Sequence, residues 1–132
     1  MLARREHSAR ELQGKLRAHD FGPEAVVGVI TQLQREGLQS DRRFTESYIH
    51  SRVEKGYGPV RIKLELREKG LDNDLIEEIL EGLETDWGAL AARIRARKFG
   101  AARPANFREQ ARQARFLQYR GFTTQQIRDV FK

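Results

Sequence analysis

The chain has 132 residues, of which 39% are hydrophobic and 33% charged, and it contains no cysteine. The absence of cysteine excludes disulfides, thiolate catalysis and cysteine-ligated zinc sites. No apolar run approaches the ~20 residues of a membrane-spanning helix, and the charged start of the chain is unlike a signal peptide. We therefore expect a cytoplasmic protein with no membrane contact.

The formal net charge of +6 is distributed unevenly along the chain. Residues 1–40 have a net charge of +1, residues 41–84 of −3 and residues 85–132 of +8. A basic end is typical of proteins that bind polyanions, although solubility alone is the simpler explanation of either charged half. Leu, Ala, Glu, Arg and Gln are abundant and there are only 3 prolines, so the composition favours helices.

The first segment of the chain is predicted to fold into two helices, preceded by the remnant of another. Ser8 and Glu11 form a capping box, which starts a helix, and Pro23 after Gly22 favours the first turn of the next one. The helices are expected at residues 9–19 and 23–37, with a remnant at 1–7, and should bury Leu12, Leu16, Val26, Val29, Ile30 and Leu33.

The second segment is predicted to hold three helices, two of which meet at a Gly-Tyr-Gly-Pro joint. Ser40 or Asp41 caps the first helix, Pro59 starts the second, and Asp72 or Asn73 caps the third. The side chains expected inside are Phe44, Tyr48, Ile49 or Val53, Ile62, Leu66, Ile76, Ile79, Leu80 and Leu83.

The third segment repeats this plan with an insertion. Asp86 caps its first helix, residues 101–106 form the insertion, and Asn106 caps the next helix. Thr123 with Gln126 caps a last short helix that reaches the end of the chain. The side chains expected inside are Trp87, Leu90, Ile94, Phe107, Ala111, Ala114 and Leu117.

One apolar pattern occurs in all three segments. Leu16, Leu66 and Leu117 lie 50 and 51 residues apart, and apolar residues follow each of them at the same offsets of five, ten, thirteen and fourteen. A repeat of this length predicts tandem units that support one another. We predict an all-α fold with repeats at residues 1–39, 40–84 and 85–132.

The sequence holds no pattern of enzyme chemistry. His7, His19 and His50 lack metal-ligand spacing and are expected to be exposed polar side chains. There is no nucleophile elbow, Walker lysine or dinucleotide-binding glycine loop. We expect neither enzymatic activity nor a cofactor or metal.

Basic residues in the third segment form the clearest candidate site. Guanidinium groups suit phosphates, and an aromatic side chain among them can stack on an unpaired base. Phe116 occupies a position that is polar in the other repeats, so it is either an exposed contact or extra packing against the insertion, whereas Arg95 should point away. The candidate DNA- or filament-binding residues are Arg93, Arg97, Lys98, Arg103, Arg108, Arg112, Arg115, Phe116 and Tyr119.

Acidic residues line one face of the last helix predicted in the second segment. A solvated face or a docking surface for a basic partner is the favoured interpretation, and a divalent-cation site is the least favoured. The residues are Glu77, Glu78, Glu81 and Glu84.

The chain resembles the family of the bacterial regulatory protein RecX, the modulator of the RecA recombinase. The similarity rests on a series of short motifs that occur in order. They are E-G-L, D-R-R-F, a tyrosine, S-R and then K-G-Y-G-P. The matching segments are residues 2–16, 35–52, 56–71, 86–100 and 115–127.

The resemblance implies three tandem three-helix, helix-turn-helix-like units in an elongated, curved monomer. It also implies binding in the groove of the RecA–single-stranded-DNA filament, with inhibition of filament extension, ATP hydrolysis, strand exchange and coprotease activity. Direct binding of single-stranded and possibly double-stranded DNA, and a role in homologous recombination, DNA repair and the SOS response, are implied too. The resemblance implies a longer first helix before Leu2, so we expect that this chain has a short or trimmed start.

The alternative function is a stand-alone DNA-binding module of helix-turn-helix type. A basic recognition helix around residues 108–120 would carry it. That alternative predicts a dimer with sequence preference, and the chain shows no heptads for dimerisation.

Overall fold

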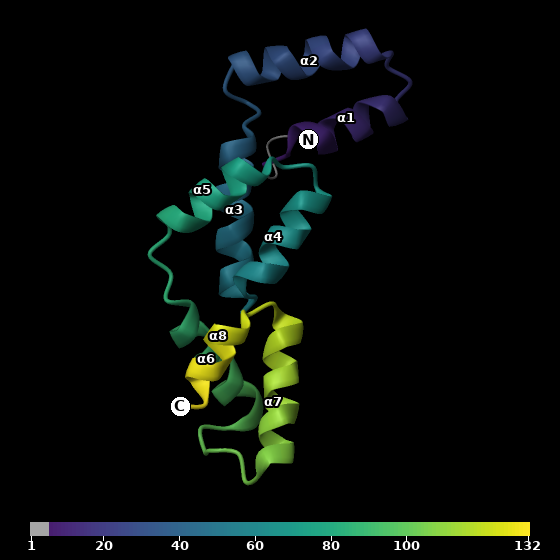
Figure 1. Ribbon diagram of the computed structural model, residues 1–132. Helices are drawn as coiled ribbons and strands as arrows, with labels where there is room; N and C mark the ends of the chain where they lie inside the picture. The colour runs from purple at the N-terminus through teal and green to yellow at the C-terminus, as the bar shows by residue number, and fades with distance from the viewer. Residues whose placement is uncertain (1–5) are drawn as a thin grey trace.

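The structure is all-α, as the composition predicts. A computed structural model describes residues 6–132, which form eight α-helices and no strand. The helices follow one another along an elongated molecule, with α1 and α2 at one end, α3–α5 in the middle and α6–α8 at the other end (Figure 1). Their bounds are α1 Ala9–Ala18, α2 Pro23–Arg35, α3 Asp41–Glu54, α4 Pro59–Glu68, α5 Asn73–Gly82, α6 Trp87–Phe99, α7 Phe107–Arg120 and α8 Thr124–Val130.

Each group of helices has its own apolar core. We call α1 and α2 the first unit, α3–α5 the second unit and α6–α8 the third unit. Leu12, Val26 and Ile30 form the small core of the first unit. The half-buried Trp87 packs against both larger cores and so connects the second unit with the third. The larger cores comprise Phe44, Ile49, Ile62, Leu66, Leu71, Ile76, Ile79 and Leu80 in the second unit, and Leu90, Ala91, Ile94, Leu117 and Phe122 in the third.

The predicted helix caps are present. The Ser8 hydroxyl accepts a hydrogen bond from the Glu11 amide, and the Glu11 carboxylate accepts one from the Ser8 amide. The same reciprocal pair links Thr123 with Gln126. Where the sequence left alternatives, the caps are Ser40 and Asp72.

The internal repeat is visible in the backbone. In each unit the helix with the anchor leucine ends with a left-handed residue: Asp20 (φ 64°), Gly70 (φ 85°) or Gly121 (φ 98°). The amide of the following residue then donates to the anchor carbonyl, as in a Schellman motif. These bonds are Phe21 to Leu16 at 3.3 Å, Leu71 to Leu66 at 3.1 Å and Phe122 to Leu117 at 3.2 Å.

The first unit departs from the predicted burial. Phe21 is 46% exposed, whereas its equivalents Leu71 and Phe122 are buried. Val29, predicted to be inside, is also exposed. The physical reason is that the described part of this unit has two helices, so no third helix covers these positions. The remnant expected at 1–7 lies mostly outside the described residues, and residues 6–8 are not helical.

His7 is buried, which contradicts its prediction as an exposed residue. Its carbonyl accepts from Gln39 Nε2 at 3.2 Å, and its Nε2 lies 3.0 Å from Lys15 Nζ. The burial follows because residues 6–8 pass between α1 and the start of the second unit. His19 and His50 are exposed, as predicted.

Two predictions about α5 and α8 are wrong at the helix ends. The last helical residue of α5 is Gly82, so Leu83 is exposed and Glu84 lies outside the helix. The final helix ends at Val130 rather than Lys132. The insertion at 101–106 is non-helical, as expected.

Candidate nucleic-acid interface

Exposed basic side chains lie on α6. Arg93 and Arg97 are four residues apart and exposed, as is Lys98. Residues at this spacing are neighbours on one helix face. No described carboxylate forms an ion pair with these three side chains. Their charges are therefore free to meet an external anion.

A second basic row lies on α7. Arg108, Arg112, Arg115 and Tyr119 are all exposed, and their spacing places them along one face. Arg112 donates to Glu109 at 2.7 and 3.0 Å. This hydrogen-bonded pair raises the pKa of Arg112 and lowers the pKa of Glu109. Arg108 and Arg115 have no ion-pair partner among the described residues, so they are the more available cations of this row.

The structure joins only part of the predicted site. Lys98 Nζ lies 5.3 Å from the Phe116 ring centre, and Arg112 Cζ lies 5.0 Å from that of Phe99. The end of α6 and the middle of α7 therefore meet. No described contact links Arg93 or Arg97 with the α7 row, and Arg103 is exposed in the insertion.

Phe116 is half-buried, which decides between its two interpretations. Its ring meets Phe99 edge-on, with centroids 5.4 Å apart, and packs against the core of the third unit. Lys98 and Arg120 lie over the same ring. Phe116 therefore packs against the core, which is the second of its two interpretations, and its role in binding stays a prediction.

Phe107 is an exposed aromatic residue at the start of α7. It was expected inside, but it is 83% exposed. It is the first residue of α7, which begins at the end of the molecule farthest from the first unit (Figure 1). Gln113, one turn before Leu117, is buried instead and accepts from Arg95 Nη1 at 2.9 Å. An exposed ring directly before Arg108 is suited to stacking on an unpaired base.

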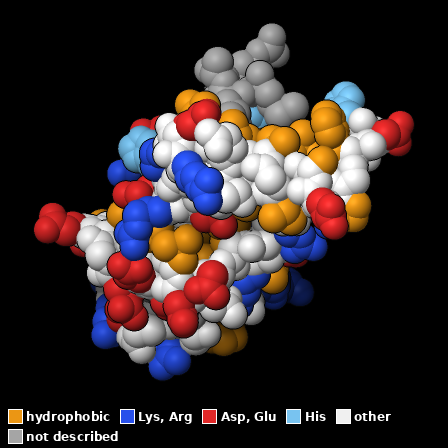
Figure 2. All heavy atoms as spheres, turned by 90° about the horizontal axis from the view of Figure 1, so that it is seen from above, with side chains coloured by type: hydrophobic (Ala, Val, Ile, Leu, Met, Phe, Trp, Pro, Cys, Tyr) orange, Lys and Arg blue, Asp and Glu red, His pale blue; other side chains and the backbone are white. Residues whose placement is uncertain are grey.

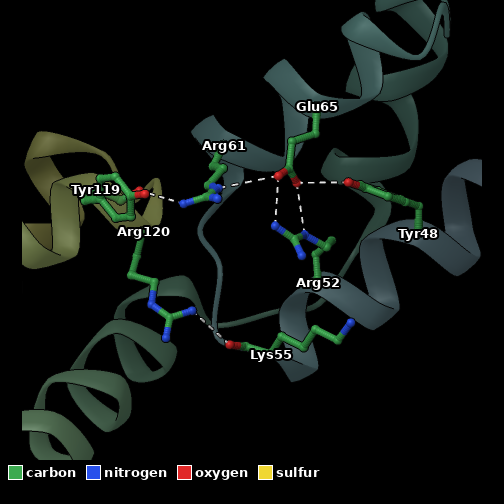
Figure 3. Close-up of polar contacts among 7 residues, drawn as sticks. All are labelled: Tyr48, Arg52, Lys55, Arg61, Glu65, Tyr119 and Arg120. Carbon is green, nitrogen blue, oxygen red and sulfur yellow. Dashed lines mark hydrogen bonds and ion pairs between the residues drawn. The ribbon is translucent and has the colours of Figure 1, made fainter.

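Arginine and tyrosine side chains gather where the second unit meets the third (Figure 3). The Tyr57 ring has three guanidinium groups around it: Arg52 at 3.8 Å, Arg61 at 4.6 Å and Arg120 at 4.6 Å from its centre. Arg61 also lies 5.2 Å from the ring centre of Tyr119. Cation–π contacts of this kind stabilise each cation by about 0.5–2 kcal/mol.

Glu65 is the acidic centre of this cluster. It accepts two hydrogen bonds from Arg52, at 2.8 and 2.9 Å, and one from Arg61 at 3.4 Å. The Tyr48 hydroxyl donates to it at 3.1 Å, and burial together with this bond raises the pKa of Tyr48 to about 12. One carboxylate therefore holds two arginines, and the cluster keeps a positive charge.

Backbone hydrogen bonds fix the same junction. The Gly58 amide donates to the Arg120 carbonyl at 2.8 Å, and the Val60 amide donates to the Gly121 carbonyl at 2.9 Å. A Cβ atom on Gly58 would lie 2.5 Å from the Gly121 carbonyl carbon. The Gly-Tyr-Gly-Pro joint therefore needs its second glycine because α7 ends against it, and the α7 row is held in one orientation relative to α4.

Beside this junction a groove runs between α4 and α7. Val60, Leu64 and Tyr119 are exposed along it, and Arg61 and Glu65 also line it. The predicted contact Tyr119 is therefore part of a mixed apolar and charged surface that spans two units.

The junction cluster was not predicted, although the joint was. Gly56 to Pro59 is a strong local signal for a turn, but it carries no information about which distant segment packs on it. Gly121 repeats the position of Gly70, but a repeated left-handed residue marks the end of a helix and does not identify the segment that packs on it.

The acidic face is partly neutralised. Glu77 pairs with Lys63 at 2.9 Å, and Glu78 pairs with Arg42 at 2.8 Å. Glu81 and Glu84 are exposed. Viewed from the first-unit end, acidic side chains gather at one edge of the molecule with hydrophobic ones among them (Figure 2). Of the four predicted glutamates, only Glu81 and Glu84 have no ion-pair partner among the described residues, so a docking surface on this face would depend mainly on these two.

The described residues include neither a metal-binding cluster nor a membrane-spanning helix. No group of His, Asp or Glu side chains within residues 6–132 could hold a metal ion. None of the described helices is long and apolar enough to cross a membrane.

Two family models match the chain. Residues 40–80 match the second three-helix domain of RecX, and residues 84–131 match the third. Together they cover the second and third units.

Named relatives match almost the whole chain. Regulatory protein RecX of Halorhodospira halophila is 51% identical over 128 residues, which cover 97% of this chain and 80% of that protein. The RecX protein of Legionella pneumophila strain Corby is 42% identical over 132 residues, covering 100% of this chain and 88% of that protein.

A solved structure has the same fold. The crystal structure of RecX from Lactobacillus salivarius superposes with a TM-score of 0.83 at 25% identity, covering 98% of this chain and 86% of that one. The three-unit arrangement is therefore shared with an experimentally determined RecX protein.

Proposed function

Because the chain belongs to the RecX family of regulatory proteins, we propose that it is a negative regulator of a RecA recombinase. In this proposal it binds in the groove of the RecA–single-stranded-DNA filament and inhibits filament extension, ATP hydrolysis, strand exchange and coprotease activity. It acts in the cytoplasm as a non-enzymatic monomer, in homologous recombination, DNA repair and the SOS response.

The observation that carries the proposal is the unpaired basic surface of the third unit. Arg108 and Arg115 lie on one face of α7 without carboxylate partners, and Phe107 is exposed beside them. Phosphates attract the guanidinium groups, and a base can stack on the ring. We assign contact with filament DNA to this surface.

A protein contact is proposed for the opposite charge. Glu81 and Glu84 are exposed and have no ion-pair partner among the described residues. They would meet a basic surface of RecA while the third unit meets DNA. The elongated molecule supports this division, since its units succeed one another along a length that can contact several subunits (Figure 1).

The test is RecA's single-stranded-DNA-dependent ATPase with the chain titrated in. The unaltered chain should inhibit it, and Arg108→Glu with Arg115→Glu should weaken inhibition. Arg17→Glu with Arg35→Glu is the matched control, because it makes the same charge change on exposed residues of the first unit.

The outcomes separate the mechanisms. Inhibition well below one chain per RecA supports capping of the growing end or locking of subunits, whereas inhibition only near saturation supports groove occupancy. Equal loss of inhibition in both double variants would remove the α7 row from the proposal. No inhibition by the folded, unaltered chain would refute RecA regulation and favour the stand-alone DNA-binding module.

A further inference from the structure

Arg95 is a buried cation with no acidic partner. It lies on α6 and is only 9% exposed, although its neighbours Arg93 and Arg97 are at the surface. Its Nη1 donates to Gln113 Oε1 at 2.9 Å and to the Ala102 carbonyl at 3.4 Å. Both acceptors are neutral, so the charge itself is not balanced.

The guanidinium group also has donors to spare. Its Nε is enclosed and has no hydrogen-bond partner, and Nη2 donates to no described acceptor. A guanidinium group keeps its charge and carries five N–H donors. Burying such a group is costly unless an opposite charge and acceptors accompany it. Arg95 therefore has more N–H donors than its two described acceptors engage.

A pocket opens beside this side chain. It is lined by Arg95, Arg103, Gln110, Phe131 and Lys132, together with Pro104 and Val130. Arg103 is exposed on its rim with no carboxylate partner among the described residues, whereas Lys132 pairs with Asp129 at 3.1 Å.

Glu109 is linked to Arg95 only through Gln113. Glu109 accepts from Gln113 at 3.2 Å and binds Arg112, so it does not reach Arg95. The Phe131 ring, 5.6 Å from Arg95 Cζ, covers the cation without supplying an anion. Of the polar side chains that line the pocket, Arg95, Arg103 and Lys132 are cationic and Gln110 is neutral.

We propose that this pocket, between the insertion and α8, is an oxyanion site that takes a phosphate group. Arg95 would supply the enclosed charge, and Arg103, on the rim, would close on the ligand, as guanidinium groups commonly do on phosphate. The phosphate comes either from solution or from the backbone of a nucleic acid. The site does not require RecA, so this proposal and the proposed function can be refuted independently of each other.

Thermal unfolding of the whole chain in phosphate tests the site. Titration with inorganic phosphate, against chloride at constant ionic strength, should raise the melting temperature in a saturable manner, because a ligand of the folded state stabilises it. Arg95→Met keeps the apolar stem and removes the charge, and it should weaken phosphate binding by about tenfold or more.

Two surface variants keep the test decisive if Arg95→Met does not fold. Arg103→Gln removes the rim charge, and its exposure makes misfolding no concern, so it should weaken binding severalfold. Arg128→Gln is the matched control, since it removes an exposed charge from the same unit outside the pocket. Phosphorus NMR of inorganic phosphate, broadened by the chain, gives a second readout of the same affinities.

A salt titration of oligonucleotide binding identifies the second source. If free phosphate has no effect, Arg95→Met or Arg103→Gln should still lower the slope of log affinity against log salt by about one, as loss of one phosphate contact does. Arg128→Gln should leave that slope unchanged. No phosphate response together with equal slopes in all variants would overturn the site.

Discussion

The junction between the second and third units should depend on the missing side chain of Gly121. Its φ of 98° is in the left-handed region, and a Cβ atom there would lie 2.3 Å from Arg61 Cβ and 2.6 Å from the Arg61 amide nitrogen. A flexible side chain could give way, but a backbone atom at this distance cannot. Gly121→Ala must therefore push the end of α7 away from α4.

The cost has two parts. A left-handed backbone costs a residue with Cβ about 1–2 kcal/mol. Separation of the helices also weakens the hydrogen bonds from Gly58 and Val60 into the end of α7, each worth about 0.5–1.5 kcal/mol. We expect Gly121→Ala to lower the free energy of unfolding by about 2–5 kcal/mol.

Gly37→Ala is the matched control. Gly37 has a φ of 72°, but nothing lies within 4 Å of the Cβ position. It should therefore cost only the backbone term of about 1–2 kcal/mol. Urea unfolding measures both losses, and hydrogen exchange locates the first. In Gly121→Ala the amides of Gly58 and Val60 should lose protection, whereas Gly37→Ala should not affect them. Equal losses in both variants, with these amides still protected, would refute the close contact.

Three further predictions concern the aromatic surface, the core and the Glu65 cluster. Phe107→Ala should weaken single-stranded-DNA binding by about 5- to 150-fold, as loss of one stacked base does, without changing thermal stability; Phe21→Ala is the exposed control, and equal DNA binding by both would exclude stacking on Phe107. Leu66→Ala should lower the free energy of unfolding, measured in urea, by about 2–5 kcal/mol, because Leu66 is fully buried. A loss below about 1 kcal/mol would contradict this prediction. Because the pKa of Tyr48 rises to about 12 from an ordinary value of 10.0, its contribution to stability is complete below pH 10 and is lost as the pH approaches 12. Tyr48→Phe should flatten the decline measured by unfolding at pH 9–12, and an unchanged decline would assign it to other groups.

Local signals in the sequence predicted most of the fold. Caps such as Ser8 with Glu11 and starts such as Pro59 depend on residues within one helical turn, so they can be read without knowledge of the tertiary structure. The repeat could also be read without the tertiary structure, because Leu16, Leu66 and Leu117 recur at a near-constant spacing along the sequence. The boundaries at 39/40 and 84/85 stay predictions.

Burial was harder to predict where it depends on what covers a helix. Phe107 fits the apolar spacing of α7, but the helix begins beyond the part of the third unit that could cover it. Phe21 fits the repeat, but the described part of the first unit lacks a third helix. Periodicity indicates which side chains share a face, whereas burial also requires a neighbour on that face.

The pattern of the sequence predicted which basic residues belong to the candidate site, but not which residues of separate helices come into contact. The basic residues of α6 and α7 that were predicted for the site are exposed, as expected. Arg52 and Arg61 joined none of the predicted sets, and Arg120 entered only as the end of the alternative recognition helix. Their contacts with Tyr57 join separate helices, and that of Arg120 forms only after two units have packed. Glu65 looked like one more solvated glutamate, yet it holds two of these arginines.

The two junctions differ in the kind of contact that holds them. Between the first and second units, each described hydrogen bond uses a side chain on one side, as when the Ala9 amide donates to Asp41 Oδ1 at 2.9 Å or Arg10 donates to the Glu68 carbonyl at 3.3 Å. Between the second and third units, backbone meets backbone at Gly58 and Gly121. Side chains can change rotamer and follow a partner, whereas backbone bonds with no Cβ between them allow little adjustment. The second and third units are therefore the part of the molecule that can present basic side chains at fixed separation, as binding to a regular polyanion requires.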